Sequence, residues 1–229
     1  MGEIINKKAA ADDIAKDCRD TLAAAAARGG QVQTLAEQYL KPSMQVFEML
    51  AQRLQAAEQV LAPLLAAQDA IDDSTDAMLG RLADELWNDV GRPASDPIYS
   101  LLFPEGVGFY TDGPDAEQPA RMELLAELLE ANLHPRMDPK RVKVLAKQVR
   151  DAAKGLRAAV DKTATPRTDV TTLGRARTAV ARSLQMSLSN LKRHYRAQGL
   201  SESDIHAIIP DRGRPRTRVA APSPQPPAP

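Results

Sequence analysis

Four aspartates close together in the sequence have a spacing that could support metal chemistry. Asp72, Asp73 and Asp76 form a DDxxD pattern, and Asp69 lies about one helical turn earlier. Side chains three and four positions apart lie on one face of a helix, and carboxylates gathered there can hold Mg²⁺ on a diphosphate group. The alternative is a solvated acidic face, because exposed charges commonly have no partner. We predict no metal site, and these four aspartates are the candidates if one exists.

The DDxxD pattern resembles the metal-binding aspartates of the all-α isoprenoid synthases. This resemblance covers five residues and implies an Mg²⁺-dependent isoprenoid-type enzyme. The rest of the chain departs from that family, because no second aspartate-rich motif follows at a plausible position and aromatic residues that would line a carbocation pocket are scarce. The enzyme is therefore the third of our hypotheses, and we predict no catalytic residue and no cofactor.

The histidines and the single cysteine give little evidence of catalysis. Glu130 and His134 are four positions apart and would share a helix face, but di-iron bundles need a Glu-x-x-His pair on each of two helices. His194 and His206 are expected at the surface. Cys18 lies in an apolar stripe, where cysteine usually acts as a small core residue. A lone cysteine forms no internal disulfide, which favours a reducing cytoplasm as the location.

The C-terminal tail contains a short basic motif, formed by Arg212, Gly213, Arg214, Pro215 and Arg216. It resembles the core of an AT-hook, and the resemblance implies contact with the minor groove of A·T-rich DNA. A glycine lets the backbone approach the groove floor, and the negative potential of a narrow groove attracts arginine. The chain departs from the pattern in having Asp211 directly before the core and only one copy. DNA is therefore an alternative partner, bound through the tail.

An aromatic segment with several glycines and prolines, residues 92–114, interrupts the helical pattern of the chain. It holds four of the eight aromatic residues, Tyr99, Phe103, Phe109 and Tyr110. Proline and glycine prevent such a segment from being helical throughout, yet it is too apolar for a solvated linker. We interpret it as a folded connection whose rings either plug a helical bundle or form a binding patch.

Apolar residues recur at helical spacing over most of the remaining chain. The first helix is expected over residues 3–28 and ends at Gly29 and Gly30, where the backbone can leave the helical conformation. The second begins near residue 31, and Pro42 either kinks it or starts a new helix at Ser43. Pro63 predicts a further kink before this helical region ends near residue 91.

Four more helices are expected after the aromatic connection. One begins between residues 115 and 121 and ends near 134, and the next opens at Asp138 and Pro139. The segment KTATPRTD, residues 162–169, is predicted to be a turn that separates this helix from a sixth. Gly199 closes the sixth helix, and Ser201 caps a short seventh helix that extends to residue 208.

These elements predict an all-α, mostly antiparallel bundle of five to seven helices over residues 1–209. Aromatic residues make up 3% of the chain, which favours helices over sheets. Residues 210–229 are rich in proline and arginine with little to bury, so we expect a disordered tail. The sequence contains no apolar run of about 20 residues, the length that a membrane-spanning helix requires. We therefore expect a soluble protein without a membrane partner.

Charge is distributed unevenly, although the 30 basic and 30 acidic residues balance. Residues 44–135 carry 4 basic and 17 acidic side chains, whereas residues 136–229 carry 20 and 7. Either acidic and basic helices lie side by side and offset each other, or a basic surface binds an acidic partner. The first explanation is the simpler one for the helical part.

The leading functional hypothesis is a non-catalytic helical scaffold or protein-interaction module. It would use a helix face or the aromatic connection to bind another protein or a second copy of itself. The alternative is an accessory DNA-associated protein that contacts A·T-rich DNA through its tail.

Overall fold

The computed structural model describes residues 9–210, and over this range it contains seven helices and no strand. Their bounds are α1 Ala11–Arg28, α2 Gly30–Asp89, α3 Pro97–Leu102, α4 Gly108–Thr111, α5 Gln118–Glu130, α6 Pro139–Ala197 and α7 Glu202–Ile208. The predicted all-α fold with an aromatic connection is confirmed. Among these helices none has the length and apolar character needed to cross a membrane.

The chain divides into two compact units, and the two longest helices each contribute to both. Unit 1 comprises Met1–Leu54 and Thr172–Pro229, and unit 2 comprises Gln55–Thr171. Each unit has its own hydrophobic core. The sequence-based division into a bundle at 1–209 and a tail at 210–229 stays a prediction, because nearly all of that tail lies outside the described residues.

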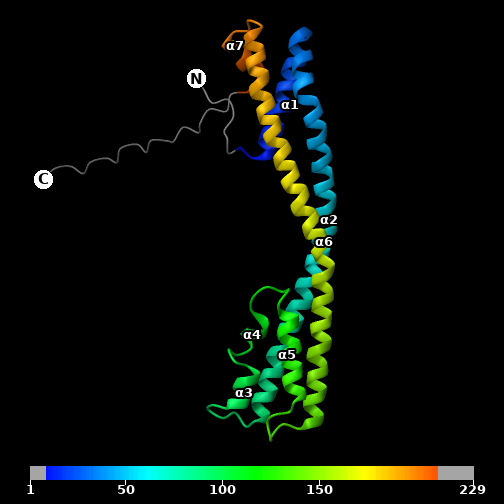
Figure 1. The fold of residues 1–229 in the computed structure, drawn as a ribbon, viewed down its shortest axis with the longest axis vertical. Helices are drawn as coiled ribbons and strands as arrows, with labels where there is room; N and C mark the ends of the chain where they lie inside the picture. Colours follow the sequence, from blue (N-terminus) through cyan, green and yellow to red (C-terminus); the bar gives the residue numbers. More distant parts are fainter. Residues whose placement is uncertain (1–8, 211–229) are drawn as a thin grey trace, which may run out of the picture. The chain divides into compact units, whose positions relative to one another are not determined.

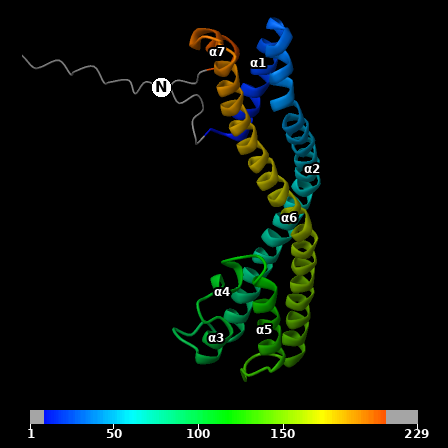
Figure 2. The ribbon, with the colours of Figure 1, turned by 45° about the horizontal axis from the view of Figure 1, so that its top comes forward.

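Unit 1 packs α1 and α7 against the first part of α2 and the last part of α6 (Figures 1 and 2). The chain turns back after α1 at Gly29, whose φ of +69° favours glycine. Cys18 is fully buried in this core, as predicted. Tyr195 is also buried, and its hydroxyl donates to the Val32 carbonyl at 2.8 Å. Helix α6 ends before Gly199, and the Ser201 side chain accepts from the Asp204 amide to cap α7.

Unit 2 packs α5 and the aromatic connection against the rest of α2 and the first part of α6 (Figure 1). Leucines from all three long elements meet in its core, among them Leu86 of α2, Leu125 of α5 and Leu156 of α6. Helix α5 ends at Glu130, earlier than the predicted end near residue 134. The two short helices α3 and α4 lie within the connection, which is otherwise irregular.

The turn predicted over residues 162–169 is wrong, because α6 runs through Pro166 without a break. An interior proline removes one backbone hydrogen bond, at a cost of about 3 kcal/mol. A contact with α2 just before the proline favours a continuous helix. Thr163 is buried and donates to Gln68 of α2 at 2.8 Å, while Thr168 bonds the Ala164 carbonyl of its own helix at 3.0 Å. Helix α2 likewise continues through both of its prolines.

Basic side chains of α6 pair with acidic side chains of α2 and α5 in unit 2. Arg141 contacts Glu85 and Asp89 of α2 at 2.9 and 2.8 Å. Arg150 and Arg157 contact α5 through Glu130 and Glu123 respectively. These pairs are exposed to solvent, so each contributes little to stability. Their positions support the explanation that acidic and basic helices lie side by side.

Candidate functional site

The aromatic side chains of the connection enter the core of unit 2. Phe103 and Tyr110 are 4% and 1% exposed, and Tyr99 and Phe109 are partly buried against the same core. The rings form a chain of contacts, with centroid distances of 5.1 Å for Tyr99 and Phe103 and 5.8 Å for Phe103 and Tyr110. Trp87 of α2 extends it, 4.6 Å from Tyr99. The connection therefore fills the core as a plug would.

Two tyrosine hydroxyls tie these rings to backbone carbonyls. Tyr110 donates to the Leu102 carbonyl at 2.6 Å, and Tyr99 donates to the Ala83 carbonyl of α2 at 3.1 Å. Burial raises the pKa of Tyr110 to about 12, and burial is also the main cause that raises the pKa of Tyr99. Both phenols therefore remain neutral hydrogen-bond donors at ordinary pH, which suits a structural role better than acid–base chemistry.

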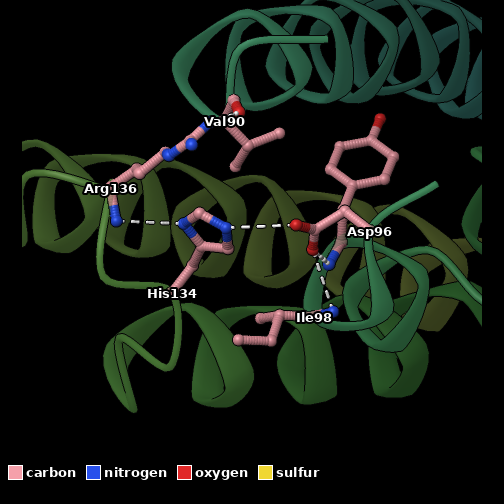
Figure 3. A network of polar contacts seen from close by, with 6 residues as sticks. Val90, Asp96, Ile98, His134 and Arg136 are labelled. Atoms are coloured by element: carbon pink, nitrogen blue, oxygen red, sulfur yellow. Dashed lines mark hydrogen bonds and ion pairs between the residues drawn. The ribbon is translucent and has the colours of Figure 1, made fainter. Parts of the chain in front are cut away.

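A buried histidine and an aspartate fix the start of the connection (Figure 3). The Nε2 atom of His134 lies 3.2 Å from Oδ2 of Asp96, and its Nδ1 atom accepts from the Arg136 amide at 3.0 Å. Because Nδ1 accepts, the proton of the neutral ring is on Nε2 and donates to Asp96. Both ring nitrogens are thus engaged, so His134 has no free nitrogen for use as a general base.

Asp96 also caps α3, and the hydrogen bonds of the cap favour its ionised form. Its Oδ1 atom accepts from the amides of Ile98 at 2.9 Å and Tyr99 at 2.7 Å. The Tyr99 amide is the largest cause that lowers the pKa of Asp96, with further contributions from His134 and Ile98. Arg136 donates to the Val90 carbonyl at 2.9 Å, at the end of α2. The network therefore joins the segment after α5 to both sides of the loop before α3.

The expected shared face of Glu130 and His134 is wrong. Helix α5 ends at Glu130, so His134 follows in the loop and faces Asp96 instead. The carboxylate of Glu130 bonds Arg150 of α6 at 2.6 Å, and this bond is the main cause that lowers its pKa. The pair cannot act as a common metal-binding unit in this arrangement.

The four candidate aspartates of α2 separate into two pairs. Asp69 and Asp73 are exposed, whereas Asp72 and Asp76 are partly buried in unit 2. The Oδ1 atoms of Asp72 and Asp76 are both inaccessible to solvent and have no hydrogen-bond partner. Within residues 9–210, no three His, Cys, Asp or Glu side chains are placed to hold a metal ion by themselves. Of the four, Asp72 and Asp76 are the two that lie close to carboxylates of the loop between α4 and α5.

Burial and neighbouring carboxylates raise the pKa values of this pair. Burial is the largest cause that raises the pKa of Asp76 to about 6, followed by the charges of Asp72, Asp73, Asp112 and Asp115. Burial and the charge of Asp115 are the leading causes that raise the pKa of Asp72. These carboxylates come from α2 and from the loop between α4 and α5, so negative charge from two elements meets at one place.

Sequence reasoning missed three buried polar side chains at this place, Gln68, Gln118 and Thr163. Gln68 accepts from Thr163 and donates to the carboxylate of Asp115. Gln118 donates to the Thr111 carbonyl at 2.6 Å, while its own Oε1 atom is buried without a donor. A signal existed for Gln68, because it follows Leu61 and Leu64 at inward helical spacing where an apolar residue is expected.

A second feature that sequence reasoning missed lies on the outer face of α2 in unit 1. Val46 and Met49 are 42% and 48% exposed, and Pro42 precedes them at helical spacing. Three exposed glutamines, Gln38, Gln45 and Gln52, flank them at intervals of seven residues. We call Pro42, Val46 and Met49 the outer row of α2. Its spacing of four and three is visible in the sequence, but the exposure is not.

The remaining candidates are two histidines and the basic motif of the tail. His194 and His206 are exposed, as predicted, and contact Tyr39 at 2.6 Å and Glu202 at 3.7 Å respectively. The AT-hook-like residues 212–216 lie outside the described residues, so DNA binding stays a prediction.

The fold defines the chain as an all-α helical protein with two hydrophobic cores. Comparison with protein families, with curated proteins and with solved structures found no match.

Proposed function

We propose that this chain is a non-catalytic helical scaffold that associates with a second copy of itself through the outer row of α2. The observation that carries this proposal is the exposure of Val46 and Met49 on one face of a long helix. Large apolar side chains that cluster on a surface commonly belong to a binding surface. The proposal makes the leading hypothesis from the sequence specific, since it commits to a helix face and to an occupant.

The geometry of α2 suits helix pairing. Leu40, Met44 and Phe47 form its inner row and are buried in the core of unit 1. The outer row repeats the same intervals of four and three two residues further along the chain. Apolar residues at such intervals form a seam against which another helix packs. Helix α2 thus has two seams in unit 1, and the core of that unit covers only the inner one.

The residues beside the outer row favour a second copy as the occupant. On one side of the row Gln38, Gln45 and Gln52 are neutral and exposed, while the exposed Arg53 continues the row four residues after Met49. In a two-fold symmetric contact each side chain meets the same surface of the other copy, so a row flanked by like charges would repel itself. Neutral amides carry both donors and acceptors and can bond to their own kind. The glutamine side of the row is therefore compatible with self-association.

The test compares the outer row with a matched methionine elsewhere in unit 1. Met49→Glu places a charge in the outer row, and Met186→Glu makes the same change on α6, where Met186 is 63% exposed. Light scattering should give the wild type a mass above 24.8 kDa that approaches twice this value as concentration rises. We expect Met49→Glu to be monomeric at all concentrations and Met186→Glu to behave as the wild type.

Two results would overturn the proposal. One is a wild type that remains a monomer up to about 200 µM, since a weaker contact would be far from the affinity of a stable assembly. The other is equal dissociation by both substitutions. Far-ultraviolet circular dichroism of each variant verifies that its helices are intact.

A further inference from the structure

Arg53 adds a positive charge at one end of the outer row of α2. It is exposed and follows Met49 by four residues. No acidic residue stands three or four positions before or after it, so it lacks the ion pairs that adjacent turns of a helix allow. Among residues 9–210, no hydrogen bond or ion pair engages its guanidinium group. A second copy that packs on this face must therefore accommodate a charge that its own chain leaves unpaired.

Two-fold symmetry leaves two directions for the second copy of α2. The two helices are either parallel and in register or antiparallel. In a parallel pair each residue of the row faces its own counterpart, so Arg53 would face Arg53 of the second copy. Two guanidinium groups in one layer repel each other, and no acidic side chain of the row is present to compensate them.

The two flanks of the row also disfavour a parallel pair. Gln45 lies on one flank and is exposed, whereas Leu50 lies on the other flank and is 8% exposed in the core of unit 1. Parallel helices bring opposite flanks together, so the Gln45 amide would approach Leu50 of the second copy. An amide that meets an apolar surface loses its hydrogen bonds to water and gains no partner.

An antiparallel pair avoids the repulsion between the arginines. When the two rows overlap over their full length, Val46 of each copy lies opposite Met49 of the other. Pro42 then lies opposite Arg53, so the two arginines are at opposite ends of the contact. Pro42 and Arg53 are eleven residues apart in the sequence, which corresponds to about 16 Å along a helix. The apolar side chains occupy the middle of the contact and the charges its ends.

Glutamine oxygens can receive the arginine in the antiparallel arrangement. Gln38 precedes Pro42 by four residues and Gln45 follows it by three, so both lie one turn from the place opposite Arg53 of the second copy. An amide oxygen accepts from a guanidinium group. The same flank of each helix then faces its counterpart, which brings Gln45 toward Gln52 of the second copy, and two amides can bond to each other.

We propose that two copies of this chain pair antiparallel along α2, with the two-fold axis between Val46 and Met49. This inference rests on the proposed function, because it gives the direction and register of the second copy on the same outer row. Arg53 selects the direction, since it is repelled in a parallel pair and is placed beside glutamine oxygens in an antiparallel one.

Disulfide cross-linking of the full chain distinguishes the two directions. A disulfide requires Cα atoms within about 7 Å of each other. The double variant Pro42→Cys/Arg53→Cys should form a covalent dimer under mild oxidation at pH 8, because its two new thiols meet across the antiparallel contact. Each single variant should form at least about fivefold less, since its thiols are about 16 Å apart along the helix. In a parallel pair each single variant would cross-link.

The native cysteine does not interfere with this experiment. Cys18 is fully buried, and burial is the main cause that raises its pKa to about 12. A thiol that is protonated and enclosed is not a nucleophile. The wild type is therefore the control that should give no covalent dimer, and light scattering of every variant before oxidation verifies that it associates.

A second measurement leaves the row itself unchanged. Gln38→Glu places a carboxylate beside Arg53 of the second copy in the antiparallel pair, and it should strengthen association about threefold, as an exposed ion pair does. In a parallel pair the two side chains would lie fifteen residues apart along the helix. Gln52→Glu is the matched control, because it adds the same charge on the same flank opposite Gln45 and should not strengthen association.

The outcomes separate this inference from the proposed function. A covalent dimer of either single cysteine variant would overturn the antiparallel arrangement and leave self-association intact. A double variant that is dimeric but does not cross-link would do the same, as would Gln38→Glu binding no tighter than its control. Arg53→Cys should still associate, and its conversion to a monomer would contradict a place for Arg53 at the edge of the contact. A wild type that stays monomeric up to about 200 µM would overturn the proposed function and this inference with it.

Discussion

Replacing Asp76 with asparagine should stabilise unit 2 at neutral pH. The pKa of this carboxyl is raised from 3.8 to about 6, chiefly by burial and then by the charge of Asp72. Each unit of difference between folded and unfolded pKa corresponds to about 1.4 kcal/mol. A shift of about two units therefore corresponds to about 3 kcal/mol, and partial solvent exposure reduces the expected gain to about 2 kcal/mol. Asparagine keeps the shape of the side chain and removes the charge.

The sign of the pH dependence follows from proton binding. Since the folded pKa lies above the unfolded value, the folded state binds more protons between about pH 4 and pH 6. The wild type therefore loses stability as pH rises through this range, and the full cost is present above the folded pKa. Other carboxyls, such as those of Asp96 and Asp151, have lowered pKa values and act in the opposite direction. The difference between wild type and Asp76→Asn cancels their contributions.

The assay is urea unfolding followed by Trp87 fluorescence at pH 4 and pH 7.5, without divalent cations. Trp87 packs against the core of unit 2, so its signal reports on that unit. Asp161→Asn is the control, because it removes a charge from an exposed position of α6 in the same unit. We expect the variant to exceed the wild type by about 2 kcal/mol at pH 7.5 and by much less at pH 4. A destabilised variant, or a gain independent of pH, would refute the electrostatic reasoning.

Three further predictions test the connection and the tail. Phe103→Ala should destabilise unit 2 by about 3 to 5 kcal/mol because the ring is buried, and Phe109→Ala should cost less because its ring is only partly buried; Trp87 fluorescence in urea compares them, and equal effects would contradict the observed burial. His134→Ala should cost about 2 to 3 kcal/mol in the same assay, since it leaves Asp96 and the Arg136 amide without their partner; a neutral effect would show that this network does not hold the connection. Deleting residues 211–229 should abolish salt-sensitive binding to an A·T-rich duplex, and a gel shift in which the intact chain shows no such binding would end the DNA hypothesis.

Local signals in the sequence predicted much of the helical architecture. Gly29 and Gly199 terminate helices because their positive φ angles suit glycine, and Ser201 caps α7 through a contact three residues away. Such signals depend only on neighbours along the chain. The turn predicted around Pro166 was wrong because a continuous α6 is favoured by a contact with Gln68, which is almost a hundred residues distant in the sequence. Propensity is overridden where tertiary contacts fix the side chains of a segment.

The different burial of the four aspartates could not be predicted from the DDxxD pattern alone. Spacing places Asp69, Asp72, Asp73 and Asp76 near one another but does not show that only Asp72 and Asp76 are partly buried. Gln118, whose side chain hydrogen-bonds to Asp72, belongs to a different helix and reaches it only because α5 packs against α2. The spacing therefore identifies a group of aspartates but not which of them the fold partly buries.

The two apolar rows of α2 are a second case in which helical spacing does not show which side chains are buried. The inner row at Leu40, Met44 and Phe47 and the outer row at Val46 and Met49 have the same helical spacing and similar residue types. Periodicity identifies a face that packs against something, but it does not distinguish a face covered by the same chain from one that remains exposed. In unit 1 the core lies on the inner row, so the outer row stays exposed to solvent. The monomeric or dimeric state of Met49→Glu decides whether that remaining face is the interface.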